Sequence, residues 1–360
     1  MRRWAKWAAL WWLALIVVLS APIVWIETRC TTHREPEAAR APLVADKGYL
    51  RRQTDTYLSF PEWHIVYAYE DLAGVLRGAD ASRFSYRGQI EGFWGSLCRL
   101  TRVAGARGAI GTDTKIMLYT IGWSFTAELA LKGAYETTVG RLFEWLRGPD
   151  RTAEDAFVAQ DMHAYAEFLR QTPWYAYPFA SRLAAFWRTT PWSGAHLARK
   201  IERRVAVTLE YAVKAGYGAL IGWASGTALG AADLEIFTVV AGLDASDVAA
   251  DRRITIVRTL PGGLTLIRTP RYQAYTEVLV GLARRGRNVV EIAGHRRILV
   301  TALMPRGPWP ELPGATELFQ ITLQSRPERR LGLDVSVESL TAAIRALEGS
   351  RAVIEHVYDY

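Results

Sequence analysis

The hydrophobic and polar positions along this 360-residue chain divide it into four segments with different patterns. An uncharged apolar run extends from Trp7 to Ile26, about the length of helix that crosses the hydrocarbon core of a bilayer. Residues 28–56 are charged and aperiodic, as in a linker. Residues 57–232 repeat apolar positions at helical spacing, and residues 233–360 mix strand-like and helix-like stretches. The pattern predicts a transmembrane anchor over residues 1–27, a linker, a membrane-associated helical domain and an α+β domain.

Basic residues precede the first apolar run, where Arg2, Arg3 and Lys6 stand before Trp7. Positive flanks stay in the cytoplasm, so we expect a cytoplasmic N-terminus with the bulk of the chain in the periplasm. A cleaved secretory signal is the alternative, but such a signal has a shorter apolar core and an Ala-x-Ala-like exit. The apolar residues here continue to Ile26, which favours an uncleaved anchor.

A row of glycines at four-residue spacing marks the predicted helix 205–230, which we call the glycine-ladder helix. Because a four-residue step returns to nearly the same helix face, the row is continuous along that face. Its members are Glu210, Lys214, Gly218, Gly222, Gly226 and Gly230. A face without side chains predicts close helix–helix contact or self-association. Arg199, Lys200, Arg203 and Arg204 precede this helix and form a second positive flank, which leaves the number of spans open.

A second predicted helix repeats part of this pattern. Thr126, Glu128, Lys132 and Tyr135 have the same spacing as Thr208, Glu210, Lys214 and Tyr217. In each copy Glu precedes Lys by four residues, which favours an ion pair within one helix. Two interpretations stay open: the helices present paired charges to a shared apolar interior, or each pair neutralises itself at the membrane surface.

The C-terminal segment from Asp233 predicts strands and helices in a repeated order. Helices are expected over Tyr272–Arg284 and Val337–Leu347, each between β-rich stretches. The Gly294-His295-Arg296 turn predicts a hairpin between strands 288–292 and 298–303. Val289-Val290-Glu291 parallels Val353-Ile354-Glu355. We therefore expect two ββαβ repeats, a ferredoxin-like domain with helices on one sheet face.

Composition narrows the class of protein. Half of the residues are hydrophobic and the net charge is +8, which suits a membrane-associated protein and excludes a disordered one. No nucleic-acid-binding motif occurs, so no nucleic-acid partner is expected. Cys30 and Cys98 are the only cysteines. They allow at most one disulfide, and we interpret them as free thiols.

Catalytic motifs do not occur in this sequence. It lacks a nucleophile elbow, a zinc-binding helix motif and a dinucleotide fingerprint, so neither a metal nor a cofactor is expected. The candidates for acid–base chemistry are Glu62, His64, Glu128 and Lys132. Glu62 also fits a capping role at the start of a helix at Ser59-Phe60-Pro61. In the last segment, Glu291, His295, Glu355 and His356 fit turn and surface roles better than catalysis.

Four segments carry a resemblance to a known group of proteins. They are SFPEWHIVYAYED (59–71), ELALKGAYE (128–136), WYAYPF (174–179) and TLEYAVKAGYG (208–218). The chain resembles a family of bacterial membrane-anchored proteins with no assigned activity, and PRYQAYTEVL and EIAG (270–294) are similar to that family's tail. The resemblance implies a bacterial inner-membrane setting and supplies no catalytic residues.

Three functions follow as hypotheses. The first is a membrane-anchored component of the bacterial envelope that binds a partner or ligand, with the lipid bilayer and a protein as partners. The second is an enzyme acting on a lipid or envelope substrate. The third is a small transport or assembly component, which needs a second membrane span.

Overall fold

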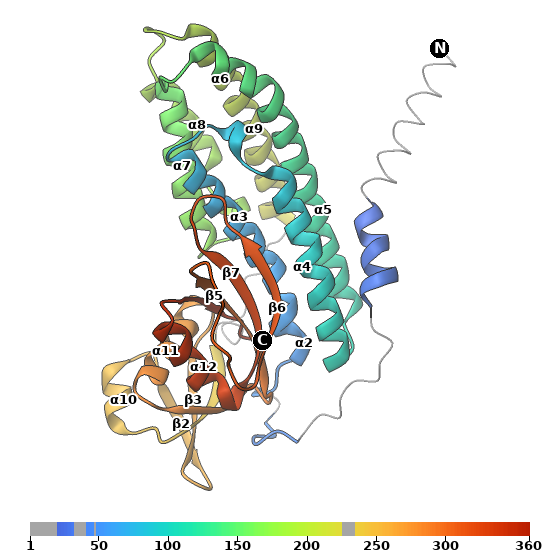
Figure 1. Cartoon of the computed structure of the whole chain (residues 1–360), viewed down its shortest axis with the longest axis vertical. Coiled ribbons are helices and arrows are strands. Elements are labelled where there is room, and N and C mark those ends of the chain that lie inside the picture. The colour runs from blue at the N-terminus through green and yellow to red at the C-terminus, as the bar shows by residue number, and fades with distance from the viewer. Residues whose placement is uncertain (1–19, 32–40, 47, 225–234) are drawn as a thin grey trace.

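The computed structural model describes residues 20–31, 41–46, 48–224 and 235–360, and consists of a helical unit stacked on a unit of two β-sheets (Figure 1). The helical unit contains η1 (Ile26–Cys30), α2 (Gln53–Leu58), α3 (Phe60–Leu76), η2 (Ala81–Arg83), α4 (Tyr86–Arg107), α5 (Thr112–Tyr135), η3 (Glu136–Gly140), α6 (Arg141–Arg147), α7 (Ala153–Leu169), η4 (Trp174–Ala176), α8 (Phe179–Thr189) and α9 (Leu197–Ala224). The predicted glycine-ladder helix therefore begins at Leu197 and not at residue 205.

The second unit contains two four-stranded antiparallel sheets. Its elements are β1 (Glu235–Ala241), α10 (Ala245–Ala250), β2 (Thr255–Leu260), β3 (Leu264–Pro270), α11 (Gln273–Arg284), β4 (Asn288–Ile292), β5 (Arg297–Met304), β6 (Ala315–Thr322), β7 (Arg329–Ser336), α12 (Val337–Gly349) and β8 (Val353–Val357). The α+β class is confirmed for this segment.

The two sheets repeat one topology. Their strand orders are β2-β3-β1-β4 and β6-β7-β5-β8, so each repeat has one strand more than the expected ββαβ unit. Glu291 lies opposite Val239, and His356 lies opposite Thr301. The register shift follows Val239 in one sheet and Thr301 in the other. Glu291 therefore corresponds to His356, one residue away from the alignment that the sequence predicted.

The expected hairpin between β4 and β5 is wrong. β4 pairs with β1, whereas β5 pairs with β7 and β8, so the turn at Gly294 carries the chain from one sheet to the other. The helices then pack crosswise: α12 contacts β4 of the first repeat, and α11 contacts β8 of the second. Leu279, Ile298 and Ile344 share one core as a result.

The second sheet also completes the core of the helical unit. Leu299, Phe319 and Tyr358 are buried together with the apolar residues of α3, α4 and α5. Asp71 of α3 reinforces this junction, since its carboxylate accepts hydrogen bonds from the backbone N–H groups of residues 324 and 325 at 2.7–3.1 Å. The two units are therefore one packed body at this junction (Figure 1).

Part of the predicted linker is docked on the first sheet. Val44 and Tyr49 are buried against Val239 and Leu266. The Glu291 carboxylate accepts hydrogen bonds from the backbone N–H of Leu43 at 2.9 Å and from the Tyr49 hydroxyl at 2.8 Å. The described residues of the segment 41–51 thus form a strap over the sheet.

The transmembrane part of the expected fold class is overturned for the part of the chain that the structure describes, where no helix is both long and apolar enough to cross a membrane. α9 has 28 residues, but seven charged residues interrupt its apolar sequence. Residues 1–19 of the predicted anchor 1–27 lie outside the described residues, which begin with Ser20.

The two cysteines are not free thiols. Cys30 of η1 and Cys98 of α4 form a disulfide with an S–S distance of 2.09 Å. Glu27 adds contacts with α5, where it accepts hydrogen bonds from Lys115 at 2.9 Å and from the Tyr119 hydroxyl at 2.6 Å. The helical segment before residue 31 is therefore fastened to both α4 and α5.

Candidate functional site in the seam between α5 and α9

Helices α5 and α9 bring four charged side chains together. Lys132 Nζ lies 2.8 Å from Glu210 Oε1, and Lys214 Nζ lies 2.7 Å from Glu128 Oε1. A third pair, Lys214–Glu210 at 3.1 Å, lies within α9. The two shortest pairs thus cross between the helices, whereas the sequence predicted pairs within each helix. We call these four residues the charge seam.

Burial and pairing fix the charges of the seam. Burial disfavours the charged form of Lys214, but the carboxylates of Glu128 and Glu210 outweigh it and raise the pKa of Lys214 well above its usual range. Burial likewise opposes ionisation of Glu210, but Lys132 and Lys214 outweigh it and lower the Glu210 pKa. General acid–base catalysis needs a pKa near the working pH. The geometry therefore favours permanent ion pairs over proton transfer by these two residues.

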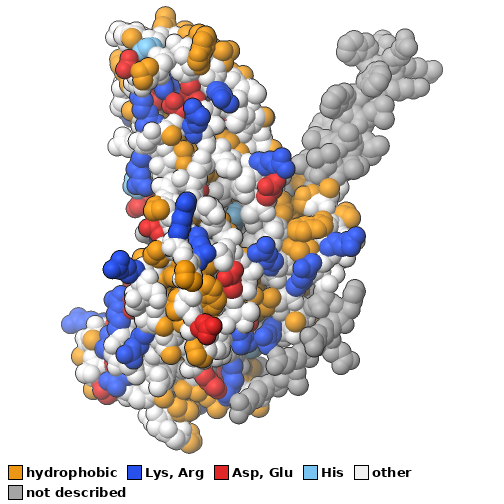
Figure 2. All heavy atoms as spheres, viewed as in Figure 1, with side chains coloured by type: hydrophobic (Ala, Val, Ile, Leu, Met, Phe, Trp, Pro, Cys, Tyr) orange, Lys and Arg blue, Asp and Glu red, His pale blue; other side chains and the backbone are white. Residues whose placement is uncertain are grey.

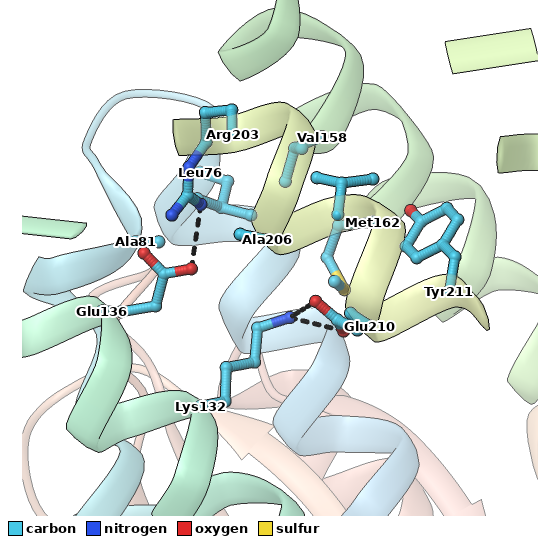
Figure 3. A pocket seen from close by; sticks show the side chains of 11 residues that line it. Leu76, Ala81, Lys132, Glu136, Val158, Met162, Arg203, Ala206, Glu210 and Tyr211 are labelled. Carbon is cyan, nitrogen blue, oxygen red and sulfur yellow. Dashed lines mark hydrogen bonds and ion pairs between the residues drawn. The ribbon is translucent and has the colours of Figure 1, made fainter. Parts of the chain in front are cut away.

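A cavity of about 20 Å³ adjoins the seam (Figure 3). Figure 3 shows Lys132 and Glu210 on one side of it and the Arg203–Glu136 ion pair on the other. Glu136 is buried, and its Oε2 has no hydrogen-bond partner. The volume suffices for one water molecule. It is far below the roughly 300 Å³ at which pockets for organic ligands begin.

Glu62 and His64 lie apart from the seam. Glu62 is exposed, while His64 is buried among the rings of Phe60, Phe93 and Phe125. Its Nε2 donates to the Gln89 carbonyl at 3.0 Å, and burial lowers the His64 pKa to about 4. The structure thus does not gather the four acid–base candidates at one point.

The basic residues at the start of α9 are buried and do not form a surface flank. Arg199 donates to Asp155 at 2.8 Å, Arg203 to Glu136 at 2.9 Å, and Arg204 to Glu154 at 2.9 Å. Lys200 donates to the backbone carbonyls of residues 191 and 193. Buried charges are tolerated only when they are paired. In the folded protein these four side chains therefore stabilise the helical unit, whereas the sequence suggested an exposed positive flank.

One member of the glycine row has a defined environment. A Cβ atom at Gly218 would lie 3.0 Å from the Tyr175 carbonyl oxygen of η4. This close approach involves a short 3₁₀ turn and not a second long helix. Gly222 lies near the end of α9, and Gly226 and Gly230 lie outside the described residues. Side-chain-free packing between long helices occurs instead at Gly122 of α5, against the ring of Phe93 in α4.

The polar candidates in the sheets have structural partners. Glu291 holds the 41–51 strap, and Glu355 forms an ion pair with Arg330 at 2.5 Å. His295 contacts the Arg51 carbonyl, and His356 stacks on Trp63 with ring centroids 4.1 Å apart. Among the described residues, no group of three or more His, Cys, Asp or Glu side chains could hold a metal ion.

The outer side of the helical unit has an unusual distribution of residues. On α9 from Leu197 to Leu220, every exposed residue is uncharged, and the charged residues are buried or half-buried. The same holds on α5 and η3 between Asp113 and Arg141. We call the large exposed hydrophobic side chains of these elements and of α6 the apolar face. They are Leu197, Ile201, Val205, Leu209, Val213, Tyr217 and Leu220 on α9, and Ile116, Met117, Trp123, Leu131, Val139, Leu142, Trp145 and Leu146 on α5, η3 and α6.

Figure 2 shows part of this distribution from one side. Orange side chains gather at the α6 end of the helical unit and at its edge beside the grey residues, while Lys and Arg side chains are spread over the rest of the visible surface. Trp145 and Val213 are 76% and 69% exposed. Monomers in water seldom expose such extended apolar patches without a binding role.

The sequence did not identify the aromatic residues around the seam. The Tyr69 hydroxyl of α3 donates to Glu128, and Tyr165 of α7 and Phe179 of α8 lie next to Lys214. A weak signal existed for two of them, because Tyr69 and Phe179 fall within the segments 59–71 and 174–179. All four segments quoted for the family resemblance supply a residue at Lys214 or at its partners. Comparison of the chain with family models, curated proteins and solved structures finds no match.

Proposed function

We propose that this protein is a partner- or ligand-binding component of a bacterial cell envelope whose apolar face binds the lipid bilayer. The observation that carries the proposal is α9, where charged side chains point inward and apolar side chains point outward. This is the reverse of the usual arrangement for a surface helix in water, whose polar face lies outside.

The chemistry of the apolar face favours hydrocarbon over a protein surface. A typical protein–protein interface carries about one hydrogen bond per 100–200 Å² and a polar rim. The exposed residues of α9 from Leu197 to Leu220 include one hydroxyl group, on Tyr217, and no charge. Burying a half-exposed Leu or Val side chain stabilises a complex by about 1 kcal/mol, and the apolar face contains several such side chains.

The disulfide supports the envelope as the compartment. Cys30–Cys98 joins residues 68 positions apart, and such bonds persist in oxidising compartments such as the bacterial periplasm. The cytoplasm keeps thiols reduced, so a stable disulfide at this place favours the outer side of the membrane for the helical unit.

A dye at Val213 tests the bilayer contact. The variant Val213→Cys carries one free thiol beside the disulfide, so an environment-sensitive dye reports on the apolar face alone. With vesicles of phosphatidylethanolamine and phosphatidylglycerol we expect a blue shift of its emission and quenching by brominated acyl chains. The matched control is Val257→Cys on β2, which is 46% exposed and for which we expect neither effect.

Two outcomes would contradict the proposal. If the protein binds vesicles while the dye at residue 213 stays in water, the apolar face is not the contact. If the emission shifts without vesicles as the protein concentration rises, a second copy covers the face in place of lipid. Light scattering at the same concentrations then gives the oligomeric state.

A further inference from the structure

Lys214 ends in a cage of aromatic rings and carboxylates. Its Nζ lies 5.4 Å from the ring centroid of Tyr69, 5.3 Å from that of Tyr165 and 5.5 Å from that of Phe179. Distances below about 6 Å are those of cation–π contacts. The carboxylates of Glu128 and Glu210 lie 2.7 and 3.1 Å from the same nitrogen. One ammonium group thus meets three rings and two negative charges, a set that we call the Lys214 cage.

The members of the cage come from five helices. Tyr69 belongs to α3, Glu128 to α5, Tyr165 to α7, Phe179 to α8, and Glu210 to α9. Tyr69 also donates to Glu128 and meets the ring of Tyr165 edge to face with centroids 5.0 Å apart, which orders the rings relative to the carboxylate. The rings and carboxylates of the cage are therefore all supplied by residues other than Lys214.

This chemistry selects one class of ligand. Aromatic faces attract a cation without donating or accepting a hydrogen bond, while the carboxylates accept N–H groups. A primary ammonium group meets both requirements. Guanidinium is planar and wider, and a neutral hydroxyl group lacks the charge.

We propose that the Lys214 cage is a binding site for a primary alkylammonium group, and that in this chain the side chain of Lys214 occupies it as an internal ligand. Because five helices supply the cage, its occupancy is coupled to the stability of the whole helical unit. This proposal does not depend on the bilayer contact.

Chemical rescue tests the site. The variant Lys214→Ala empties the cage, and its melting temperature should fall well below that of the wild type. Addition of n-propylammonium chloride, which replaces the three carbons and the ammonium group that the variant lacks, should restore most of this loss in a saturable manner. Sodium chloride at equal ionic strength and n-propanol, which has the same chain without the charge, should restore none of it.

Lys132→Ala is the matched control variant. Lys132 belongs to the same charge seam and its side chain has nearly the same exposure, 12% against 11%, but its Nζ pairs with Glu210 and makes no cation–π contact with the described aromatic rings. n-Propylammonium should therefore raise the melting temperature of Lys214→Ala far more than that of Lys132→Ala. Equal effects on the two variants, or an effect of n-propanol as large as that of the amine, would overturn the proposal.

A second measurement applies if the Lys214→Ala variant does not fold without a ligand. Lys214→Ala is then refolded from urea with n-propylammonium or with n-propanol, and the yield of folded protein is measured by near-UV circular dichroism. A higher yield with the amine supports the cage. Equal yields would refute it.

Discussion

His64 shows how one buried side chain links the fold to pH. Burial holds its folded-state pKa at about 4, against about 6.5 in an unfolded chain. Between these values the unfolded chain binds the proton and the folded chain does not, so the stabilisation is present above pH 6.5 and is lost as the pH falls toward 4. The difference between the two pKa values corresponds to about 3 kcal/mol in the free energy of unfolding.

We expect His64→Gln to weaken the dependence of the free energy of unfolding on pH between 6.5 and 4. Urea denaturation at several pH values measures that slope. Part of the pH dependence should remain in His64→Gln, because burial also lowers the pKa of His356, to about 3. The control is His163→Gln at an exposed position. A slope that is unchanged in His64→Gln would show that this histidine is protonated in the folded state.

At the residue scale, the sequence predicted which charges matter but not their partners. Glu128, Lys132, Glu210 and Lys214 were recognisable from their repeated spacing. Spacing reports only on neighbours along one helix, whereas Lys132 and Lys214 make their shortest pairs with the other helix. The burial of Arg204 was equally hidden, because its contacts with Glu154 and with the ring of Trp192 join residues distant in sequence.

Among the elements, η1 depends on its attachment to α4. The Cys30–Cys98 disulfide closes a loop of 68 residues, for which loop-closure entropy predicts a stabilisation of about 4 kcal/mol. We expect the double variant Cys30→Ser/Cys98→Ser to lose about that free energy of unfolding, measured by urea denaturation. Dithiothreitol should lower the stability of the wild type to the same level and leave the variant unchanged. Two reactive thiols in the denatured, unreduced wild type would contradict the disulfide.

The elements differ in how far the sequence reveals them. α11 and α12 were predicted within a few residues, because their apolar spacing and terminal glycines are local signals. β4 and β5 were also located, but their assignment to one hairpin was wrong. A tight turn between two strands usually joins neighbours, and only the crosswise packing of α11 and α12 decides that this one does not.

At the scale of the whole molecule, the second sheet and the helical unit share a core through Phe319. This ring is 2% exposed and packs on Phe60 of α3 with centroids 4.5 Å apart. Phe319→Ala should lower the free energy of unfolding by about 3–5 kcal/mol. Hydrogen exchange should show lost protection in α3 and α4 as well as in β6. The control is Ile256→Ala on the exposed strand β2, and protection in α3 that survives Phe319→Ala would separate the two units.

The shared core also sets the order in which the protein is completed during synthesis. The helices leave the ribosome first, yet Leu299, Phe319 and Tyr358 fill their interior. Until residue 358 has emerged, the apolar residues of α3 and α4 lack these packing partners. The nascent chain therefore exposes apolar surface until its synthesis is nearly complete. Exposed apolar surface promotes aggregation and is the feature that chaperones bind.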